Sequence, residues 1–132
     1  MTDTQPPAAT AETFAALDAQ EFAVLTTSRR DGRPVPTTVW FAHNVGRLYI
    51  QTGLNAGKVK RICGNSAVTL APSTRMGEVL GDAVAATARI LSPQEAGVAD
   101  AALARKYGAR RQQVMAQMGV SELNYLEISP RA

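Results

Sequence analysis

The sequence predicts a mainly β protein, a β-barrel with peripheral helices. Short alternating strand patterns separated by turn signals fill most of residues 22–91, and one further strand pattern ends the chain after two helical patterns. Strands joined by short turns pair antiparallel, and a terminal strand can close the resulting sheet. Periodicity alone does not decide closure, so an α+β sandwich and an open sheet stay as alternatives.

The first half of the chain predicts a short helix and three strands. Thr10 is expected to cap the helix, whose Phe14 and Leu17 share one face. Pro34 and Pro36 place the start of the second strand at an edge or an irregular position, because proline has no N–H to donate to a neighbour. We expect strands at residues 22–28, 34–42 and 47–52, an Asp-Gly turn at 29–33 and a second turn at 43–46.

The second half predicts a short helix, two more strands, a long helix and a closing strand. Ser92, Pro93 and Glu95 have the pattern of an N-cap, a first helical residue and a capping-box glutamate, and Gly108 is suited to end that helix. We expect helices at residues 58–64, 93–107 and 110–118, and strands at 68–72, 82–91 and 124–129.

The composition fits one globular domain. With 132 residues, of which 45% are hydrophobic, the chain can bury a core without disulfides. We expect residues 1–9 to form a flexible N-terminus and residues 10–132 a single domain. A single cysteine suits a reducing compartment, and no apolar run approaches the roughly 20 residues of a membrane span. These features predict a cytoplasmic protein without membrane contact.

The charge balance is compatible with an anionic small ligand. The chain has 14 Lys and Arg against 11 Asp and Glu, which gives a net charge of +3. The basic residues are not interleaved with aromatic ones, and aromatic residues make up only 5% of the chain. We therefore expect no nucleic-acid partner.

The sequence shows no pattern of a metal site or of a catalytic nucleophile, and we assign no catalytic residue. One histidine and one cysteine fall short of a zinc ligand set. Neither a glycine-rich phosphate fingerprint nor a Gly-x-Ser-x-Gly motif is present. We interpret His43 as an exposed turn histidine and Cys63 as a packed or partly exposed thiol.

A cluster of cations begins the helix that follows the third strand. Lys58 and Arg61 are three positions apart and share a helical face, whereas Lys60 points elsewhere into solvent. The first-turn amides after Gly57 and the Lys58 ammonium suit a phosphate group. A solvated helix face explains the same spacing, and the pattern alone does not separate the two.

Polar side chains on two neighbouring strands could meet the edge of a ring. Residues 37–38 and 51–52 offer hydroxyl and amide groups for this purpose. Trp40 could cover a flat ring, although a lone tryptophan on a strand is more often part of a core.

Taken in chain order, these segments resemble the pyridoxamine-phosphate-oxidase-like proteins, the split β-barrel family that binds flavins and deazaflavins. The branch that the chain resembles most is the actinobacterial group of oxidoreductases that use the deazaflavin coenzyme F-420. The similar segments, which span roughly residues 11–130, are the Thr-rich first strand, DGRPVPTTVWFA, RLYIQT, GKVKRI, NSAVTLAP, VAATARILSPQEA, LARKYG and YLEISP. The resemblance implies the FMN-binding split barrel fold and a homodimer with two cofactor sites at the subunit interface.

The resemblance also implies which residues hold the cofactor. Those expected along the ring system are Pro36, Thr37, Thr38, Val39 and Trp40, with Gln51 and Thr52 beside the ring. Those expected around the phosphate are Ala56, Gly57 and Lys58, followed on the same face by Arg61.

The phosphate turn favours F-420 over FMN within this family. FMN oxidases of the same fold carry Arg or Ser beside the lysine, where this chain has Ala56 and Gly57. The Lys-Val-Lys-Arg run is more similar to the F-420 branch, whose coenzyme has a long anionic tail of phosphate and glutamate. Residues 63–67 lack three cations that this branch often carries, which predicts weaker binding of the tail.

The implied activity is an oxidoreductase that transfers a hydride between F-420 and a small organic substrate, at an activated C=C or imine bond. The protein would orient the ring, align the substrate and limit the access of water. Two alternatives stay open: an FMN-binding oxidoreductase of the same fold, and a non-enzymatic protein that binds a cofactor or a tetrapyrrole.

Overall fold

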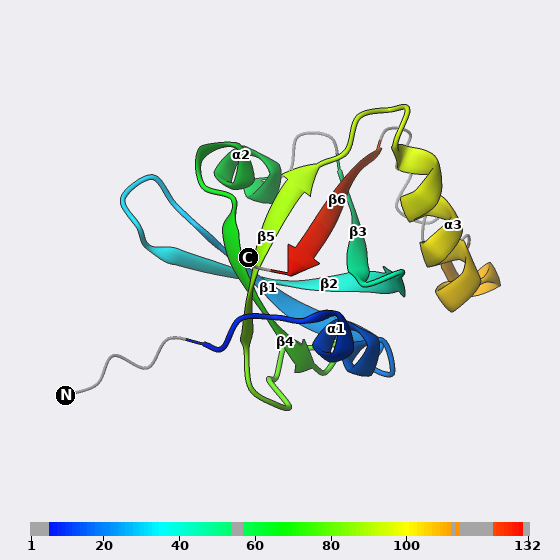
Figure 1. Ribbon diagram of the computed structural model, residues 1–132, viewed down its shortest axis with the longest axis horizontal. Coiled ribbons are helices and arrows are strands. Elements are labelled where there is room, and N and C mark those ends of the chain that lie inside the picture. The colour runs from blue at the N-terminus through cyan, green and yellow to red at the C-terminus, as the bar shows by residue number, and fades with distance from the viewer. Residues whose placement is uncertain (1–5, 54–56, 112, 114–122, 131–132) are drawn as a thin grey trace.

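A computed structural model describes residues 6–53, 57–111, 113 and 123–130 of the chain. Its strands form a closed antiparallel barrel in the order β1-β2-β3-β6-β5-β4 (Figure 1). They are β1 (Phe22–Ser28), β2 (Pro34–Asn44), β3 (Arg47–Gly53), β4 (Ala67–Ser73), β5 (Val84–Ile90) and β6 (Leu123–Pro130). The predicted fold class is confirmed, and closure excludes the open sheet and the sandwich.

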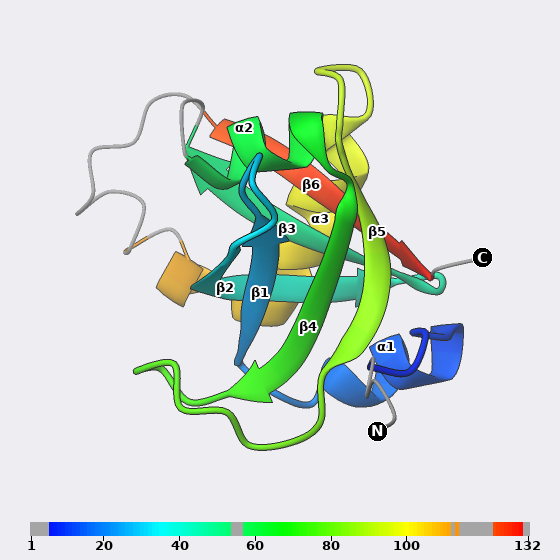
Figure 2. The same cartoon turned by 90° about the vertical axis from the view of Figure 1, so that its left-hand side faces the viewer.

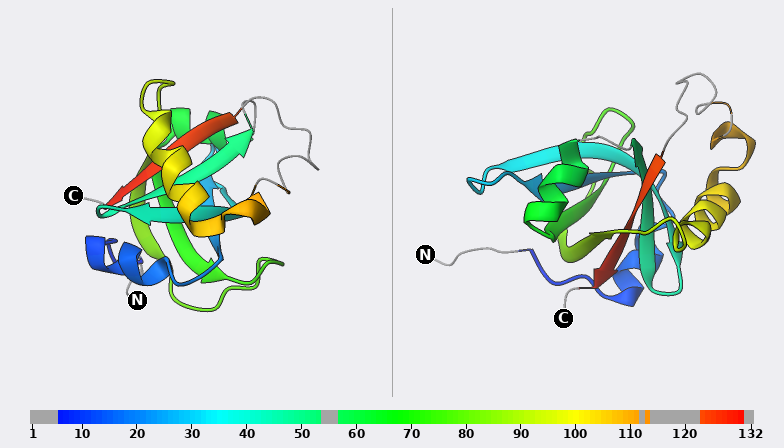
Figure 3. Two further views of the ribbon diagram at one scale, coloured as in Figure 1. Left: turned by 90° about the vertical axis from the view of Figure 1, so that its right-hand side faces the viewer. Right: turned by 90° about the horizontal axis from the view of Figure 1, so that it is seen from above.

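Within the described ranges the named helices lie outside the barrel: α1 (Ala11–Leu17), α2 (Gly57–Gly64) and α3 (Ala96–Tyr107). Figure 2 shows α1 and α2 at opposite ends of the barrel, and the left view of Figure 3 shows α3 lying across β2 and β3. Thr10 caps α1 as predicted. The Thr10 hydroxyl accepts a hydrogen bond from the Thr13 N–H, and the Thr13 hydroxyl accepts one from the Thr10 N–H. No helix among the described residues is long and apolar enough to cross a membrane.

Two apolar clusters hold these layers together. The barrel interior is filled by side chains that alternate along the strands, together with Phe14 from α1. A second cluster joins the outer face of the barrel to α3, and it contains Ala42, Tyr49, Leu91, Ala99, Ala102, Leu103 and Tyr107. The strands β2 and β3 are therefore covered on both faces where α3 crosses them.

The hairpin between β2 and β3 is tighter than predicted. Only Val45 and Gly46 form the turn, both with positive φ (47° and 76°), so the strand extends two residues further to Asn44. His43 lies in this strand and is half-buried, and its Nε2 accepts a hydrogen bond of 3.1 Å from the Gly46 N–H. Its interpretation as an exposed turn histidine is wrong, because the imidazole shapes the hairpin.

The start predicted for the long helix is also wrong, although its end at Gly108 is confirmed. Residues 93–95 form a turn, and α3 begins only at Ala96. The Glu95 carboxylate accepts from the Ser92 N–H at 3.0 Å, as a capping box requires, but it also forms an ion pair of 2.7 Å with Arg89 of β5. This pair ties the turn to the barrel wall before the helix starts.

The two ends of the chain are described in part. Ala9 is buried, its N–H donates to the Ala85 carbonyl at 2.7 Å, and the Ala85 N–H donates to the Pro7 carbonyl at 2.8 Å. These bonds fasten the segment before α1 to β5, while the flexibility expected for residues 1–9 stays a prediction. Most of the helix expected at 110–118 lies outside the described residues, and residues 109–111 are helical.

The end of α3 is anchored to the barrel by a buried tyrosine. The Tyr107 hydroxyl accepts from the Phe41 N–H at 3.0 Å and lies 2.7 and 2.8 Å from the carbonyl oxygens of Glu21 and Phe41. Burial raises the pKa of Tyr107, so the hydroxyl keeps its proton at ordinary pH. Lys106 adds an ion pair of 3.1 Å with Asp18.

We predict that Tyr107→Phe lowers the free energy of unfolding by about 1–3 kcal/mol, because it leaves the buried Phe41 N–H without an acceptor. Urea unfolding followed by circular dichroism measures this loss. Tyr125→Phe is the control, since the partners of that more exposed hydroxyl, Arg111 and Asp100, keep their own ion pair, and it should cost clearly less. Equal losses in the two variants would show that the Tyr107 hydroxyl is not the anchor.

Candidate functional site

The barrel wall opens between β2 and β3. These strands pair only from Phe41–Ile50 to Asn44–Arg47. Beyond that point the first half of β2 pairs with β1 alone, and the last residues of β3 pair with β6 alone. Pro34 and Pro36 stand in the half of β2 that faces the opening, where a missing N–H leaves no ladder incomplete. The prediction of an edge position at these prolines is confirmed.

A pocket of about 580 Å³ lies at this opening, and we call it the split pocket. A volume of this size is typical of small-molecule and cofactor sites. Its walls come from the start of β1, the middle of β2, the end of β3, the first turn of α2, the β4–β5 connection and the helical residues after α3. The lining residues are Glu21, Phe22, Thr38, Val39, Trp40, Gln51, Lys58, Arg75 and Arg110.

The split pocket has an excess of positive charge. Lys58, Arg75 and Arg110 line it, and the one carboxylate among the described lining residues is that of Glu21. That carboxylate forms an ion pair of 2.6 Å with Arg110. Lys58 and Arg75 have no acidic partner among the described residues. The pocket is therefore suited to an anionic group near Lys58 and Arg75.

Lys58 is the half-buried cation of this set. Desolvation lowers the pKa of its ammonium group, and the positive charge of Arg61 lowers it further. Arg61 itself donates to the buried Thr27 hydroxyl and folds back over Gly57, where an added Cβ would lie 2.8 Å from its Nη1. Glycine at position 57 therefore gives Arg61 the space to lie beside the start of α2.

Trp40 forms a fixed wall of the split pocket. Its ring stacks on Tyr107, with 4.4 Å between ring centroids and 8° between planes, and Arg110 lies 5.8 Å above the ring. Phe22 contacts it at a tilt, with centroids 6.4 Å apart. Trp40 thus packs against the second apolar cluster and lines the pocket at the same time.

The Gln51 side chain is held by a network that the sequence did not predict. The Gln51 Oε1 accepts from Arg111 Nε at 2.8 Å, and Arg111 Nη2 forms an ion pair of 2.8 Å with Asp100. The Tyr125 hydroxyl lies 3.1 Å from the same carboxylate and 3.2 Å from Arg111. The hydrogen bond from Arg111 keeps the pKa of Asp100 below its usual range.

The residues expected to bind a cofactor divide into two groups. Five line the split pocket, namely Thr38, Val39, Trp40, Gln51 and Lys58. The others described, which do not line it, are Pro36, Thr37, Thr52, Gly57 and Arg61. Ala56 lies outside the described residues. The Thr52 hydroxyl is buried and has no hydrogen-bond partner within the described ranges, and the strand alternation places it on the same face as the core residue Ile50.

Four lining residues were absent from the sequence prediction: Glu21, Phe22, Arg75 and Arg110. Glu21 and Phe22 are neighbours, but Arg75 and Arg110 lie far from them and from each other in the chain, and no spacing rule connects the three segments. Pairing along β1 brings Phe22 beside Trp40, with which it is in register.

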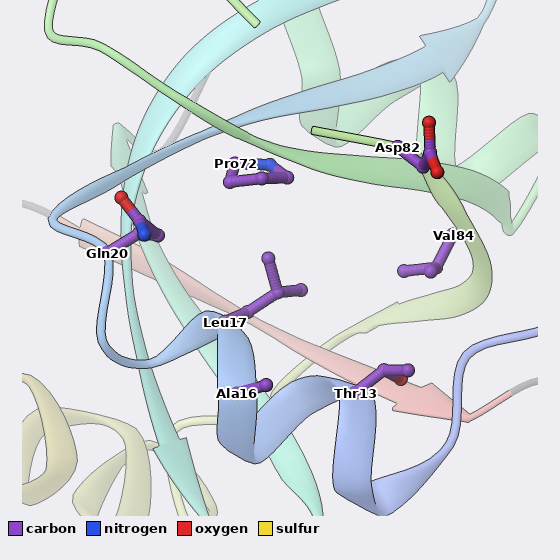
Figure 4. A pocket seen from close by; sticks show the side chains of 7 residues that line it. All are labelled: Thr13, Ala16, Leu17, Gln20, Pro72, Asp82 and Val84. Carbon is purple, nitrogen blue, oxygen red and sulfur yellow. The ribbon is translucent and has the colours of Figure 1, made fainter. Parts of the chain in front are cut away.

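A second cavity, of about 270 Å³, lies between α1 and the strands β4 and β5 (Figure 4). Leu17, Pro72 and Val84 form its apolar walls. Among the described residues that line it, only Asp82 is charged, and its carboxylate would repel an anion. An anionic ligand is therefore better accommodated by the split pocket.

The chain is similar to known proteins at the level of family and of fold. The family model described as pyridoxamine 5′-phosphate oxidase matches residues 9–131. No curated protein of similar sequence was found.

Solved structures share the fold at low sequence identity. A conserved hypothetical protein of Mycobacterium tuberculosis aligns over 99% of this chain and 87% of its own, with a TM-score of 0.68 and 16% identity. The heme storage protein HutZ of Vibrio cholerae aligns over 92% and 89%, with a TM-score of 0.65 and 13% identity. General Stress Protein 26 of Bacillus anthracis aligns over 91% and 88%, with a TM-score of 0.62 and 20% identity.

We predict that Lys58→Met stabilises the ligand-free protein, because it removes a desolvated cation beside Arg61 and keeps the aliphatic stem. The pKa of Lys58 is lower in the folded chain than in the unfolded chain, so the charged ammonium destabilises the folded state. This destabilisation has its full size at pH values below the folded-state pKa. The gain should shrink as the pH rises towards 10.5, the ordinary value. Urea midpoints at several pH values measure it.

Lys60→Met is the matched control on the same helix. Lys60 is exposed, so its replacement should change the free energy of unfolding by no more than about 0.5 kcal/mol. A Lys58→Met variant that is less stable than the wild type at neutral pH would contradict the prediction.

Proposed function

This chain belongs to the pyridoxamine 5′-phosphate oxidase family, and we propose that it is an oxidoreductase that binds coenzyme F-420 in the split pocket. The observation that carries this proposal is the half-buried Lys58 ammonium, which lies in a cofactor-sized pocket with no acidic partner among the described residues. A cation in that position is costly unless an anion binds beside it.

The residues of the split pocket fit the two chemical ends of a deazaflavin coenzyme. Lys58 and Arg75 suit the phosphate and the anionic tail of the coenzyme. The backbone amides in the first turn of α2, the helix that carries Lys58, suit the phosphate as well. Trp40 and Phe22 provide apolar surface for a flat ring. The Gln51 amide provides a polar group for the edge of that ring.

When bound, the reduced coenzyme supplies a hydride, and an electron-poor C=C or imine bond of a small substrate accepts it. The chain's own contribution is binding, orientation and exclusion of water. The stacking on Tyr107 fixes Trp40, so the ring would meet a rigid wall. The proton that completes the reduction comes from solvent in this proposal, because the described lining holds no histidine, cysteine or tyrosine and its carboxylate, Glu21, is paired with Arg110.

A heme is the alternative ligand suggested by one structural relative, since HutZ is described as a heme storage protein. Heme iron is most often ligated by histidine, cysteine, methionine or tyrosine. None of these lines the described split pocket, and the single histidine, His43, bonds to Gly46 in the β2–β3 hairpin. The lining therefore favours a deazaflavin or a flavin over a heme.

FMN is the closer alternative, because it shares the ring edge and the phosphate. At the phosphate turn the chain has glycine at position 57, where an FMN oxidase of this fold has a donor side chain. Titration with both cofactors separates the two, since a bound flavin has two visible absorption bands and a deazaflavin has one. Tight binding without turnover across a panel of reductase substrates would instead support a cofactor-binding protein.

We also propose that the protein is a homodimer with the split pocket beside the subunit interface. Supporting this, Met76, Val79 and Leu80 expose apolar side chains on the connection that carries Arg75 (90%, 54% and 56% exposed). Apolar side chains grouped in this way are typical of an interaction surface.

We predict that Lys58→Ala weakens F-420 binding by about 1–3 kcal/mol, the range of a charge-assisted hydrogen bond. Fluorescence titration of the purified protein measures the dissociation constant. Lys60→Ala, on the exposed face of α2, is the control and should keep wild-type affinity. An unchanged constant in Lys58→Ala would remove this lysine from the phosphate site.

Analytical ultracentrifugation tests the proposed assembly. At micromolar concentration the protein should sediment as a dimer of the 14.0 kDa chain. A double variant, Met76→Glu with Leu80→Glu, should shift the distribution towards monomer, because it places two charges in the apolar patch. A wild-type monomer at this concentration would overturn the interface.

A further inference from the structure

The Gln51 side-chain amide has an oxygen end that accepts hydrogen bonds and a nitrogen end that donates them, and the two ends have different surroundings in the structure. Its Oε1 is occupied by Arg111, whose Nε lies 2.8 Å away. Its amide nitrogen has no protein partner among the residues that the structure describes. Gln51 lines the split pocket and stands at the point where β3 leaves β2.

The chemistry of arginine decides which end faces the pocket. A guanidinium group has N–H donors and no acceptor, so it can bind only the oxygen end of an amide. Rotating the Gln51 amide by half a turn would bring two donors together and break this bond. Because Oε1 is engaged by Arg111, the NH₂ group is the end of the Gln51 amide that remains available to a ligand in the pocket.

Arg111 can hold the amide in this way because it is itself fixed. Its side chain is only 7% exposed, and Nη2 forms the ion pair of 2.8 Å with Asp100. The Tyr125 hydroxyl lies 3.2 Å from the same nitrogen. Leaving the pair incomplete would strand a buried charge, so the guanidinium has little freedom to turn away from Gln51.

We propose that Arg111 is a positioning residue that makes Gln51 an obligatory hydrogen-bond donor, so that the split pocket selects ligands with a carbonyl or another acceptor at this edge. The pyrimidinedione edge of deazaflavins and flavins carries such carbonyl groups. The proposal rests on the function proposed above, and it adds the direction of the hydrogen bond and the residue that sets it.

A double-mutant cycle tests whether Arg111 acts through Gln51. Wild type, Gln51→Met, Arg111→Met and the double variant are titrated with F-420 and with FMN. Each single variant should bind the cofactor about fivefold more weakly than the wild type, which is the effect expected from the loss of one neutral hydrogen bond. The double variant should bind no more weakly than Gln51→Met. Arg105→Met, which removes only a contact to the His43 carbonyl, is the control and should bind as the wild type.

Gln51→Glu tests the direction of the bond without removing Arg111. Its carboxylate still accepts from Arg111 but offers the pocket an acceptor in place of a donor, so the variant should fold normally and bind more weakly than Gln51→Met. Riboflavin is titrated in parallel, because it has the same ring edge without a phosphate for the new charge to repel.

The outcomes separate this proposal from the function on which it rests. If the wild type binds neither F-420 nor FMN, both fail. If the wild type binds but Arg111→Met keeps its affinity, or if the losses multiply to about 25-fold in the double variant, only the positioning role fails. Wild-type affinity of Gln51→Glu for riboflavin would overturn the donor assignment even if Arg111→Met proved too unstable to study.

Discussion

The separation of β2 from β3 after the Phe41–Ile50 pair is the constraint on which the site depends. A closed barrel needs β3 to pair with β6, and this leaves the first half of β2 with β1 as its only partner. Pro34 and Pro36 stand in that half, where their missing N–H groups cost no ladder bond. Because α2 follows soon after β3, the same separation brings Lys58 to the opening.

The opening between β2 and β3 is surrounded by charged side chains that a purely structural part of the barrel would not need. Lys58 is partly desolvated and has no acidic partner within the described residues, while Arg111 is a buried charge held by an exposed carboxylate. Trp40, which also lines the pocket, is held in place by its stack on Tyr107, and the hydrogen bonds of the Tyr107 hydroxyl fix that tyrosine. Costly polar groups beside a rigid apolar wall are the usual composition of a binding site, where stability is exchanged for function.

Much of this fold could be predicted from local pattern, because alternation and turn chemistry act over a few residues. The strand at 22–28, the cap at Thr10 and the helix end at Gly108 were all predicted from such signals. The start of α3 was not, because an ion pair with Arg89 of β5 decides the position of Glu95. The bond between Gln51 and Arg111 joins residues 60 positions apart and left no signal in spacing, and the family resemblance indicated Gln51 without its partner.

Mapping the binding of F-420 by NMR tests most directly the claim that the opening between β2 and β3 is a cofactor site. On addition of F-420 to the uniformly ¹⁵N-labelled protein, the amide signals of Thr38, Trp40, Gln51 and Lys58 should move together and saturate at one dissociation constant. Signals around the second cavity, such as those of Leu17 and Val84, should stay in place. Shifts centred on that cavity, or no shifts with either F-420 or FMN, would contradict the assignment of the site.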